Sequence, residues 1–110
     1  MADTLKVLGQ VAPADTNNAD LYTVPENTQT TVSSLVACNL TGNTPSFRVA
    51  VRPLGATVAN EHYIYYGKAL AANDSVFIII GITLQDGDIV TVRSSAADEV
   101  AFTLFGVETS

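Results

Sequence analysis

Short runs of strand-forming residues follow one another from Thr30 to Val107, and clusters of Gly, Pro, Asn and Asp separate most of them. The runs are TTVSSLVACNL, SFRVAVR, HYIYY, SVFIIIGITL, DIVTVRS and EVAFTLFGV. Short strands with regular spacing are typical of an all-β sandwich or barrel. Since no helical apolar period interrupts them, we expect less than about a tenth of the residues in helices. We predict an all-β fold with a single antiparallel β-sandwich, either a jelly roll or an Ig-like domain.

Five strands are predicted at defined segments, which are Thr30–Leu40, Ser46–Arg52, Val76–Leu84, Asp88–Arg93 and Glu99–Val107. Side chains that alternate between the two faces of a strand place a set of apolar residues in the core: Phe47, Val49, Ile78, Ile80, Val90, Val92, Phe102 and Leu104. The run VFIIIGITL is the most apolar stretch, so we expect it to be fully buried at the centre of the sandwich. Gly81 inside it suggests a bulge or a close backbone approach.

Two further local patterns give specific expectations. Strict alternation within Thr30–Leu40 places Val32, Val36, Cys38 and Leu40 on one face and Leu35 and Ala37 on the other. The dipeptide Asp86-Gly87 is a strong signal for a β-hairpin.

The first twenty residues differ from the rest of the chain. A strand is expected near Thr4–Val11, with Leu5 and Val7 on one face and Leu8 on the other, and the polar stretch APADTNNAD follows it. We therefore divide the chain into an N-terminal strand or arm with its loop, residues 1–20, and a β-sandwich domain, residues 21–110. The arm could fold back on the sandwich or reach a neighbouring subunit. We predict that it takes part in a contact between subunits.

The charge balance limits the partners. The chain has 110 residues, with 11 acidic and 5 basic side chains and a net charge of −6. Phosphate backbones would be repelled by this field, so we expect no binding to nucleic acid. The apolar runs are too short to cross a membrane. The opening MADTLKVLGQ lacks the pattern of a signal peptide, so we expect synthesis in a cytoplasm from about Met1.

Residues that could carry a reaction are scarce. His62 is the only imidazole and Cys38 the only thiol, so multi-histidine metal sites and a Ser-His-Asp set have no basis in this sequence. We expect Cys38 to be a buried, inert thiol. The acidic pair around Gly87 fits a turn better than a calcium loop. We predict no catalytic residues, no metal ligands and no cofactor, and therefore no enzyme.

The candidate functional residues are those suited to an interface. Arg48 and Arg52 lie four residues apart on the outward side of a strand and could bind carboxylates of a partner, although a solvated outer face is favoured. Tyr63 and Tyr65 offer rigid contact area, and packing in the core explains them equally well. The predicted interface residues are Leu5, Val7, Leu8, Arg48, Arg52, Tyr63 and Tyr65.

Several segments taken in order carry a family resemblance. They are LKVLGQ, DLYTVP, the ACN that ends the long strand, FRVAVRPLGA, YIYY, NDS, GITLQDGDIVTV and FTLFGVE. In this order they resemble a family of short β-sandwich virion proteins of tailed bacteriophages, prominent among phages of cyanobacteria and marine bacteria. The resemblance spans nearly the whole chain. It implies a structural protein of the virion, on the head or in the tail, and brings no enzymatic residues with it.

Three functions compete on these grounds. The leading hypothesis is a capsid decoration (cement) protein that binds the assembled head and is itself a homo-oligomer, most simply a trimer, with the major capsid protein or other virion proteins as partners. The second is a tail, baseplate or fibre module, including a carbohydrate-binding one that uses Tyr63, Tyr65 and Tyr66. The third, a small metal-dependent enzyme on a β-fold, lacks the histidines it would need. We expect the protein in the virion, assembled in the host cytoplasm.

Overall fold

Eight β-strands pair in a nested order in the computed structural model, which describes residues 2–110 apart from the side chain of Ile80. The strands are β1 (Asp3–Val11), β2 (Ala19–Thr23), β3 (Gln29–Asn39), β4 (Ser46–Arg52), β5 (Tyr63–Ala69), β6 (Ser75–Leu84), β7 (Ile89–Ser94) and β8 (Val100–Thr109). β1 pairs with β8, β2 with β7, β3 with β6 and β4 with β5, all antiparallel. The chain is thus one long hairpin rolled up on itself, and this arrangement is a jelly roll.

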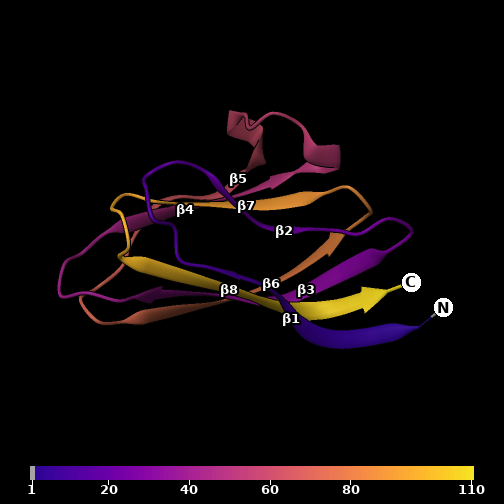
Figure 1. Ribbon diagram of the computed structural model, residues 1–110, viewed down its shortest axis with the longest axis horizontal. Helices are drawn as coiled ribbons and strands as arrows, with labels where there is room; N and C mark the ends of the chain where they lie inside the picture. The colour runs from indigo at the N-terminus through magenta and orange to yellow at the C-terminus, as the bar shows by residue number, and fades with distance from the viewer. Residues whose placement is uncertain (1) are drawn as a thin grey trace.

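Successive pairs of this hairpin alternate between two sheets that pack face to face (Figure 1). The first sheet has the strand order β1-β8-β3-β6, and the second has the order β2-β7-β4-β5. The predicted antiparallel β-sandwich is therefore confirmed, and the pairing favours the jelly roll over the Ig-like alternative. All five predicted strands are present with their ends shifted by two residues at most.

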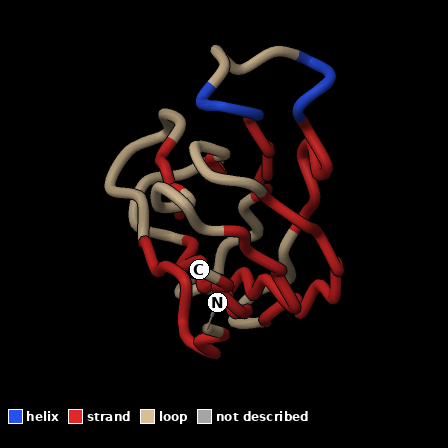
Figure 2. The backbone as a smooth tube through the Cα atoms, turned by 90° about the vertical axis from the view of Figure 1, so that its right-hand side faces the viewer, coloured by secondary structure: helices blue, strands red, loops and turns tan. Residues whose placement is uncertain are grey.

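Helical structure in residues 2–110 is limited to two short 3₁₀ turns, η1 (Pro53–Gly55) and η2 (Asn60–His62). Both lie in the long connection between β4 and β5. This connection projects from the second sheet, away from the first (Figure 2, blue). No helix in the described residues is long and apolar enough to cross a membrane.

The core lies between the two sheets and is built from alternate residues of every central strand. Phe102 of β8 and Phe47 of β4 meet across it, with ring centres 5.8 Å apart and ring planes at 69°. Edge-to-face aromatic pairs of this kind add to the gain from burial. Seven of the predicted core residues are buried: Phe47, Val49, Ile78, Val90, Val92, Phe102 and Leu104. The side chain of Ile80, the eighth, lies outside the described part of the structure.

The expected alternation along β3 is wrong because the strand contains a bulge. Its pairing with both neighbours shifts between Val32 and Ser34. An extra residue in a strand moves every later side chain to the opposite face. Val32 therefore points into the core together with Leu35 and Ala37. The other predicted members of its face, Val36, Cys38 and Leu40, are partly or largely exposed, so Cys38 is only half-buried.

The expected central position of VFIIIGITL is also wrong. β6 is an outer strand of the first sheet and has β3 as its one neighbour. Ile78 and Leu84 are buried, but Phe77 and Ile79 are 73% and 88% exposed. A continuous apolar run predicts burial on both faces, whereas here no described segment of the chain covers one of the two faces. The bulge suggested by Gly81 is confirmed. The segment of β6 from Ile79 to Ile82 lies opposite the segment of β3 from Ser34 to Val32, so β6 contains one extra residue there.

The turn at Asp86-Gly87 is tight but does not form the predicted hairpin. Gly87 has a φ of 86°, and the Asp88 N–H donates to the Gln85 carbonyl at 3.1 Å. β6 and β7, which the turn joins, lie in different sheets. Turn residues specify the local backbone reversal, and the sheet that the next strand joins depends on distant pairing. The Asp88 carboxylate accepts from the N–H groups of Leu54 and Gln85 at 2.9 and 3.0 Å, so it serves the turn itself.

The N-terminal segment belongs to the sandwich. β1 pairs along its length with β8 of its own chain, and Leu8 is a member of the core. The predicted boundary at residue 20 therefore falls inside the folded unit. Of the two positions left open for the N-terminal strand, the structure shows the one on its own sandwich, and the predicted contact between subunits stays a prediction. The expected faces are right, since Leu5 and Val7 point away from the core that buries Leu8.

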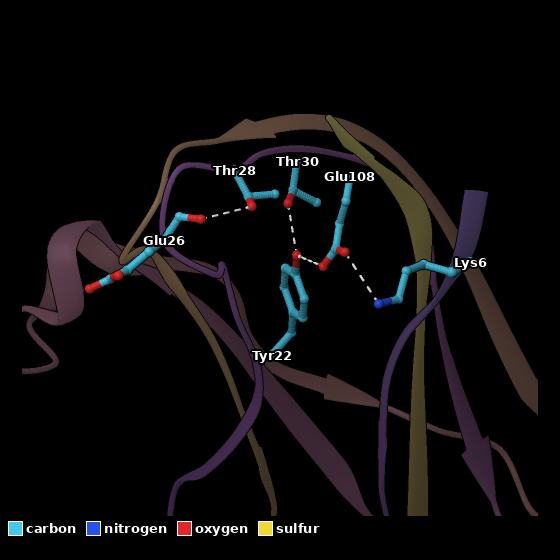
Figure 3. Close-up of polar contacts among 6 residues, drawn as sticks. All are labelled: Lys6, Tyr22, Glu26, Thr28, Thr30 and Glu108. Carbon is cyan, nitrogen blue, oxygen red and sulfur yellow. Dashed lines mark hydrogen bonds and ion pairs between the residues drawn. The ribbon is translucent and has the colours of Figure 1, made fainter. Parts of the chain in front are cut away.

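One end of the sandwich is held by a polar cluster between the sheets (Figure 3). The Tyr22 hydroxyl of β2 donates to Glu108 Oε2 of β8 at 2.6 Å and lies 2.8 Å from Thr30 Oγ1 of β3. Lys6 Nζ of β1 donates to Glu108 Oε1 at 3.2 Å. Burial and the bond to Glu108 raise the pKa of Tyr22 to about 12. The bond from Tyr22 in turn lowers the pKa of the Glu108 carboxyl.

This cluster predicts an alkaline sensitivity. The pKa of Tyr22 is higher in the folded state than its ordinary value of 10.0. The contribution of the protonated Tyr22 to the free energy of unfolding is therefore complete below pH about 10 and is lost as the pH rises towards 12. Tyr22→Phe should lower the unfolding free energy at pH 8 by about 1–2 kcal/mol, and the gap to the wild type should narrow by pH 11.5. Urea unfolding at both pH values measures this. Tyr66→Phe, at an exposed ring, is the control, and a gap that stays constant with pH would contradict the assignment.

Candidate functional site: an uncharged apolar sheet face

The outer face of the first sheet carries apolar side chains in register across its four strands. Val7 pairs with Phe105, Phe105 with Ser34, and Ser34 with Ile79, so these four form one row from edge to edge. Phe77 of β6 lies opposite Val36 of β3, and Leu5 of β1 lies opposite Val107 of β8. Bulges in β1, β3 and β6 keep the rows aligned. The rows form one continuous surface because cross-strand neighbours lie about 5 Å apart.

We name this surface the apolar face and define it by its five most exposed members: Leu5, Val7, Phe77, Ile79 and Phe105. They are 80%, 46%, 73%, 88% and 37% exposed. No other segment of the described chain crosses this side of the sandwich, which is the lower side in Figure 1. Soluble monomers rarely expose apolar patches this continuous, and those that do use them as contact sites.

Charge is nearly absent from this face, although the chain as a whole carries a net charge of −6. Polar positions between the apolar ones are Ser and Thr, such as Ser34, Thr31 and Thr83. Asp3, at the far end of β1, accepts a hydrogen bond from the Thr109 hydroxyl at 2.8 Å. Lys6 and Glu108 turn to the inner side and pair there. Depletion of charge at the centre with aromatic and aliphatic residues exposed is the composition of a protein interface core.

The free edge of β6 extends the same surface. Of the four outer strands, β6 is the longest and alone contains neither a charged residue nor proline. β1 contains Asp3 and Lys6, β2 contains Asp20, and β5 contains Lys68. Charged side chains and proline are the usual means by which proteins prevent edge-to-edge association. The bulge at Gly81 is the one such feature on β6, and it leaves Ser75–Ile79 as a regular edge.

The predicted interface residues separate into three groups in the structure. Leu5 and Val7 belong to the apolar face, whereas Leu8 is in the core. Phe77, Ile79 and Phe105 were missed as interface residues, although they dominate the face. Phe77 and Ile79 lie in a run that is visibly apolar and uncharged in the sequence, but the position of that run at a sheet edge follows only from the pairing of distant strands.

The two predicted arginines have different surroundings. Arg52 is tied into its own sheet, with bonds of 2.9 Å from Nη2 to Asp20 Oδ1 and from Nε to Thr91 Oγ1, and its side chain is 16% exposed. Its hydrogen-bond donors are therefore largely used within the chain and do not favour a contact with a partner. Arg48 lies over the Tyr66 ring, with its guanidinium carbon 4.0 Å from the ring centre. This cation–π contact fixes the head of Arg48 on the outer side of the second sheet.

The tyrosines do not form a single platform. Tyr65 packs against the core, with its ring centre 6.1 Å from that of Phe47. Tyr63 and Tyr66 meet outside the sheet at 4.9 Å with ring planes at 85°. A register shift in β5 between these pairs brings Tyr63 and Tyr66 together although strict alternation separates them. The predicted pair Tyr63 and Tyr65 is thus divided between surface and core.

The groups that could support chemistry are engaged locally or dispersed. His62 Nδ1 accepts a hydrogen bond from the Ala59 N–H at 3.0 Å and so closes the η2 turn. In the described residues, no three His, Cys, Asp or Glu side chains come close enough together to hold a metal ion. Asn39, the first residue of an Asn-Leu-Thr triplet, is buried, and its amide nitrogen donates to the Asn43 and Ala71 carbonyls at 2.7 and 2.9 Å. Its role is to hold a loop.

Comparisons with known proteins add a weak likeness in fold. No family model matches the chain, and no curated protein does. Among solved structures, the fold is similar to a chain in "Structure of infectious bursal disease virus Gx strain", with a TM-score of 0.48 and 11% sequence identity. The likeness covers 97% of this chain and 31% of that chain, so this protein spans about a third of the length of the viral one.

Proposed function

We propose that this protein is a structural protein of a bacteriophage virion, and that it acts as a capsid decoration (cement) protein that binds the assembled head through the apolar face. The observation that carries the proposal is the uncharged face itself, with Phe77 and Ile79 more than two-thirds exposed. Burying one such side chain gains about 1.5–3 kcal/mol. The resemblance to virion proteins of tailed phages supports a location in the phage particle. The jelly roll is also a frequent fold of capsid domains.

The occupant of the face in this proposal is an apolar surface of the major capsid protein. Copies of this chain, each with a net charge of −6, repel one another at close range. The apolar face carries almost no charge, so it can contact the capsid shell without adding to the repulsion between neighbouring bound copies. Each contact is modest, and repetition over a symmetric lattice makes the total stabilisation large. The role is one of binding, and the sole histidine is occupied in a turn.

The tail or fibre alternative with a sugar-binding platform receives less support. It needs an exposed aromatic face beside polar groups. Tyr65 packs on the core, the Arg48 guanidinium lies over one face of the Tyr66 ring, and the Tyr63 ring packs against the same ring. The predicted homo-trimer stays a prediction, and sedimentation of the isolated protein measures it directly.

The proposal predicts loss of particle binding when the apolar face receives a charge. Ile79→Lys should reduce the number of bound copies at least tenfold, because truncating a residue at the centre of an interface costs about 2 kcal/mol or more. Quantitative mass spectrometry of purified virions gives the copy number. Leu54→Lys is the matched control, since Leu54 is 70% exposed on the connection above the other sheet. It should bind as the wild type does.

Two results would overturn different parts of the proposal. Fewer than about ten copies in each wild-type particle would exclude a decoration role, because reinforcement of a lattice needs many copies. Full binding by Ile79→Lys would leave the virion role intact and move the contact away from the apolar face. If sedimentation shows that Ile79→Lys instead disrupts an oligomer of the isolated protein, the occupant of the face is a second copy.

A further inference from the structure

Two arginines face each other on the outer side of the second sheet. Arg48 of β4 and Arg93 of β7 are direct partners in the antiparallel register. Like charges placed opposite one another in a sheet are destabilising. The chain has 5 basic side chains against 11 acidic ones, so the fold has placed two of its few cations together.

Neither arginine of this pair is neutralised by a carboxylate in the described part of the chain. The ion pairs found there are Lys6–Glu108 and Arg52–Asp20. Arg48 and Arg93 are both partly buried. The two guanidinium groups therefore form a local excess of positive charge on an acidic protein.

The pair opens onto a cavity of about 330 Å³. Both arginines line it, together with small polar residues from β4, from the end of β7 and the residue after it, and from the loop before β2: Thr16, Ser46, Ser94 and Ser95. The Ser95 hydroxyl accepts a bond from the Ser46 N–H at 2.9 Å, which leaves its proton free to donate. Two arginines and the Ser95 hydroxyl therefore place several hydrogen-bond donors around one hollow.

We propose that this cavity, the arginine cavity, binds a carboxylate side chain presented by an acidic segment of a partner protein. Guanidinium groups bind carboxylates with paired hydrogen bonds. A long phosphate backbone is disfavoured by the net charge of −6. A sugar acid is disfavoured because sugar rings need a free aromatic face, and the aromatic residue that lines the cavity, Phe47, is only 1% exposed. The site is distinct from the apolar face, since it lies on the other sheet, and does not depend on the virion role.

The test uses three probes on the full-length protein, which are tetraglutamate, trigalacturonate and inorganic phosphate. Nuclear magnetic resonance follows the side-chain N–H signals of Arg48 and Arg93 during each titration. Tetraglutamate should shift both signals, and Arg93→Gln should weaken its binding about tenfold, since a hydrogen bond to a charged group is worth at least that factor. Arg52→Gln is the matched control. It removes the same charge from the same sheet but an arginine already paired with Asp20, so binding should change less than about twofold at 0.15 M salt.

A thermal melt of Arg93→Gln separates a binding role from a structural one. Relief of the like-charge contact should leave the midpoint at or above that of the wild type, whereas a structural arginine would lower it. Three outcomes overturn the proposal. They are no shift with tetraglutamate, equal weakening by Arg52→Gln and Arg93→Gln, and binding of trigalacturonate or phosphate that is at least tenfold tighter than that of tetraglutamate.

Discussion

Truncating Phe102 to alanine should lower the unfolding free energy by about 3–5 kcal/mol, a large part of the stability of a small domain. Phe102 is 1% exposed, and its ring packs edge-to-face on Phe47 of the opposite sheet. The substitution removes that contact and leaves a cavity between the sheets, which the rigid strands on either side cannot close. Urea unfolding followed by circular dichroism measures the loss.

Phe105→Ala is the matched control for this prediction. It removes the same side chain from the same strand, three residues further along, but on the apolar face, where Phe105 is 37% exposed. The expected cost is below about 1 kcal/mol. Equal losses at the two positions would mean that β8 does not separate core from surface as described, and the definition of the apolar face would fail with it.

The sequence predicted the strands and most of the core because these depend on local pattern. Ser46–Arg52 was predicted with its observed ends, and its alternation correctly directs Phe47 and Val49 inward. A half-buried strand has a period of two residues, and a strand of seven residues without a bulge keeps that period. β3 broke the rule at Val32–Ser34, because a bulge follows from pairing with both neighbours and leaves no clear mark in the sequence.

The candidate site was harder to predict for a topological reason. Leu5 and Val7 were expected at an interface, and they are on the apolar face of a strand that pairs with β8 of its own chain. Phe77 and Ile79 were expected in the core, because an uninterrupted apolar run usually lies in a central strand. Only the nested pairing of the jelly roll shows that β6 is an outer strand. The arginine pair was missed similarly, since Arg93 lies 45 positions beyond Arg48 in the numbering and meets it through register alone.

Replacing Gly106 with alanine should also lower the unfolding free energy strongly. The reason is the opposite of that for Phe102→Ala, because this substitution adds atoms where there is no space. A Cβ at this position would lie 2.3 Å from the Thr31 carbonyl oxygen, 2.9 Å from a methyl carbon of Leu8 and 3.1 Å from the Val32 Cα. Two of these three atoms are backbone of the neighbouring strand β3, which cannot turn aside as a side chain can. We expect a loss of about 3 kcal/mol, at the upper end of the range for over-packing.

Gly81→Ala provides the control for Gly106→Ala, because a Cβ there would meet no atom within 4 Å. Its unfolding free energy should stay within about 0.5 kcal/mol of the wild type. A mild effect at both glycines would show that β3 and β8 can separate, and that the close contact between these strands beneath the apolar face is not rigid.

The Gly106 and Ile79 variants together distinguish loss of the fold from loss of binding. Gly106→Ala should lose particle binding together with stability, whereas Ile79→Lys should lose particle binding with its unfolding free energy nearly unchanged.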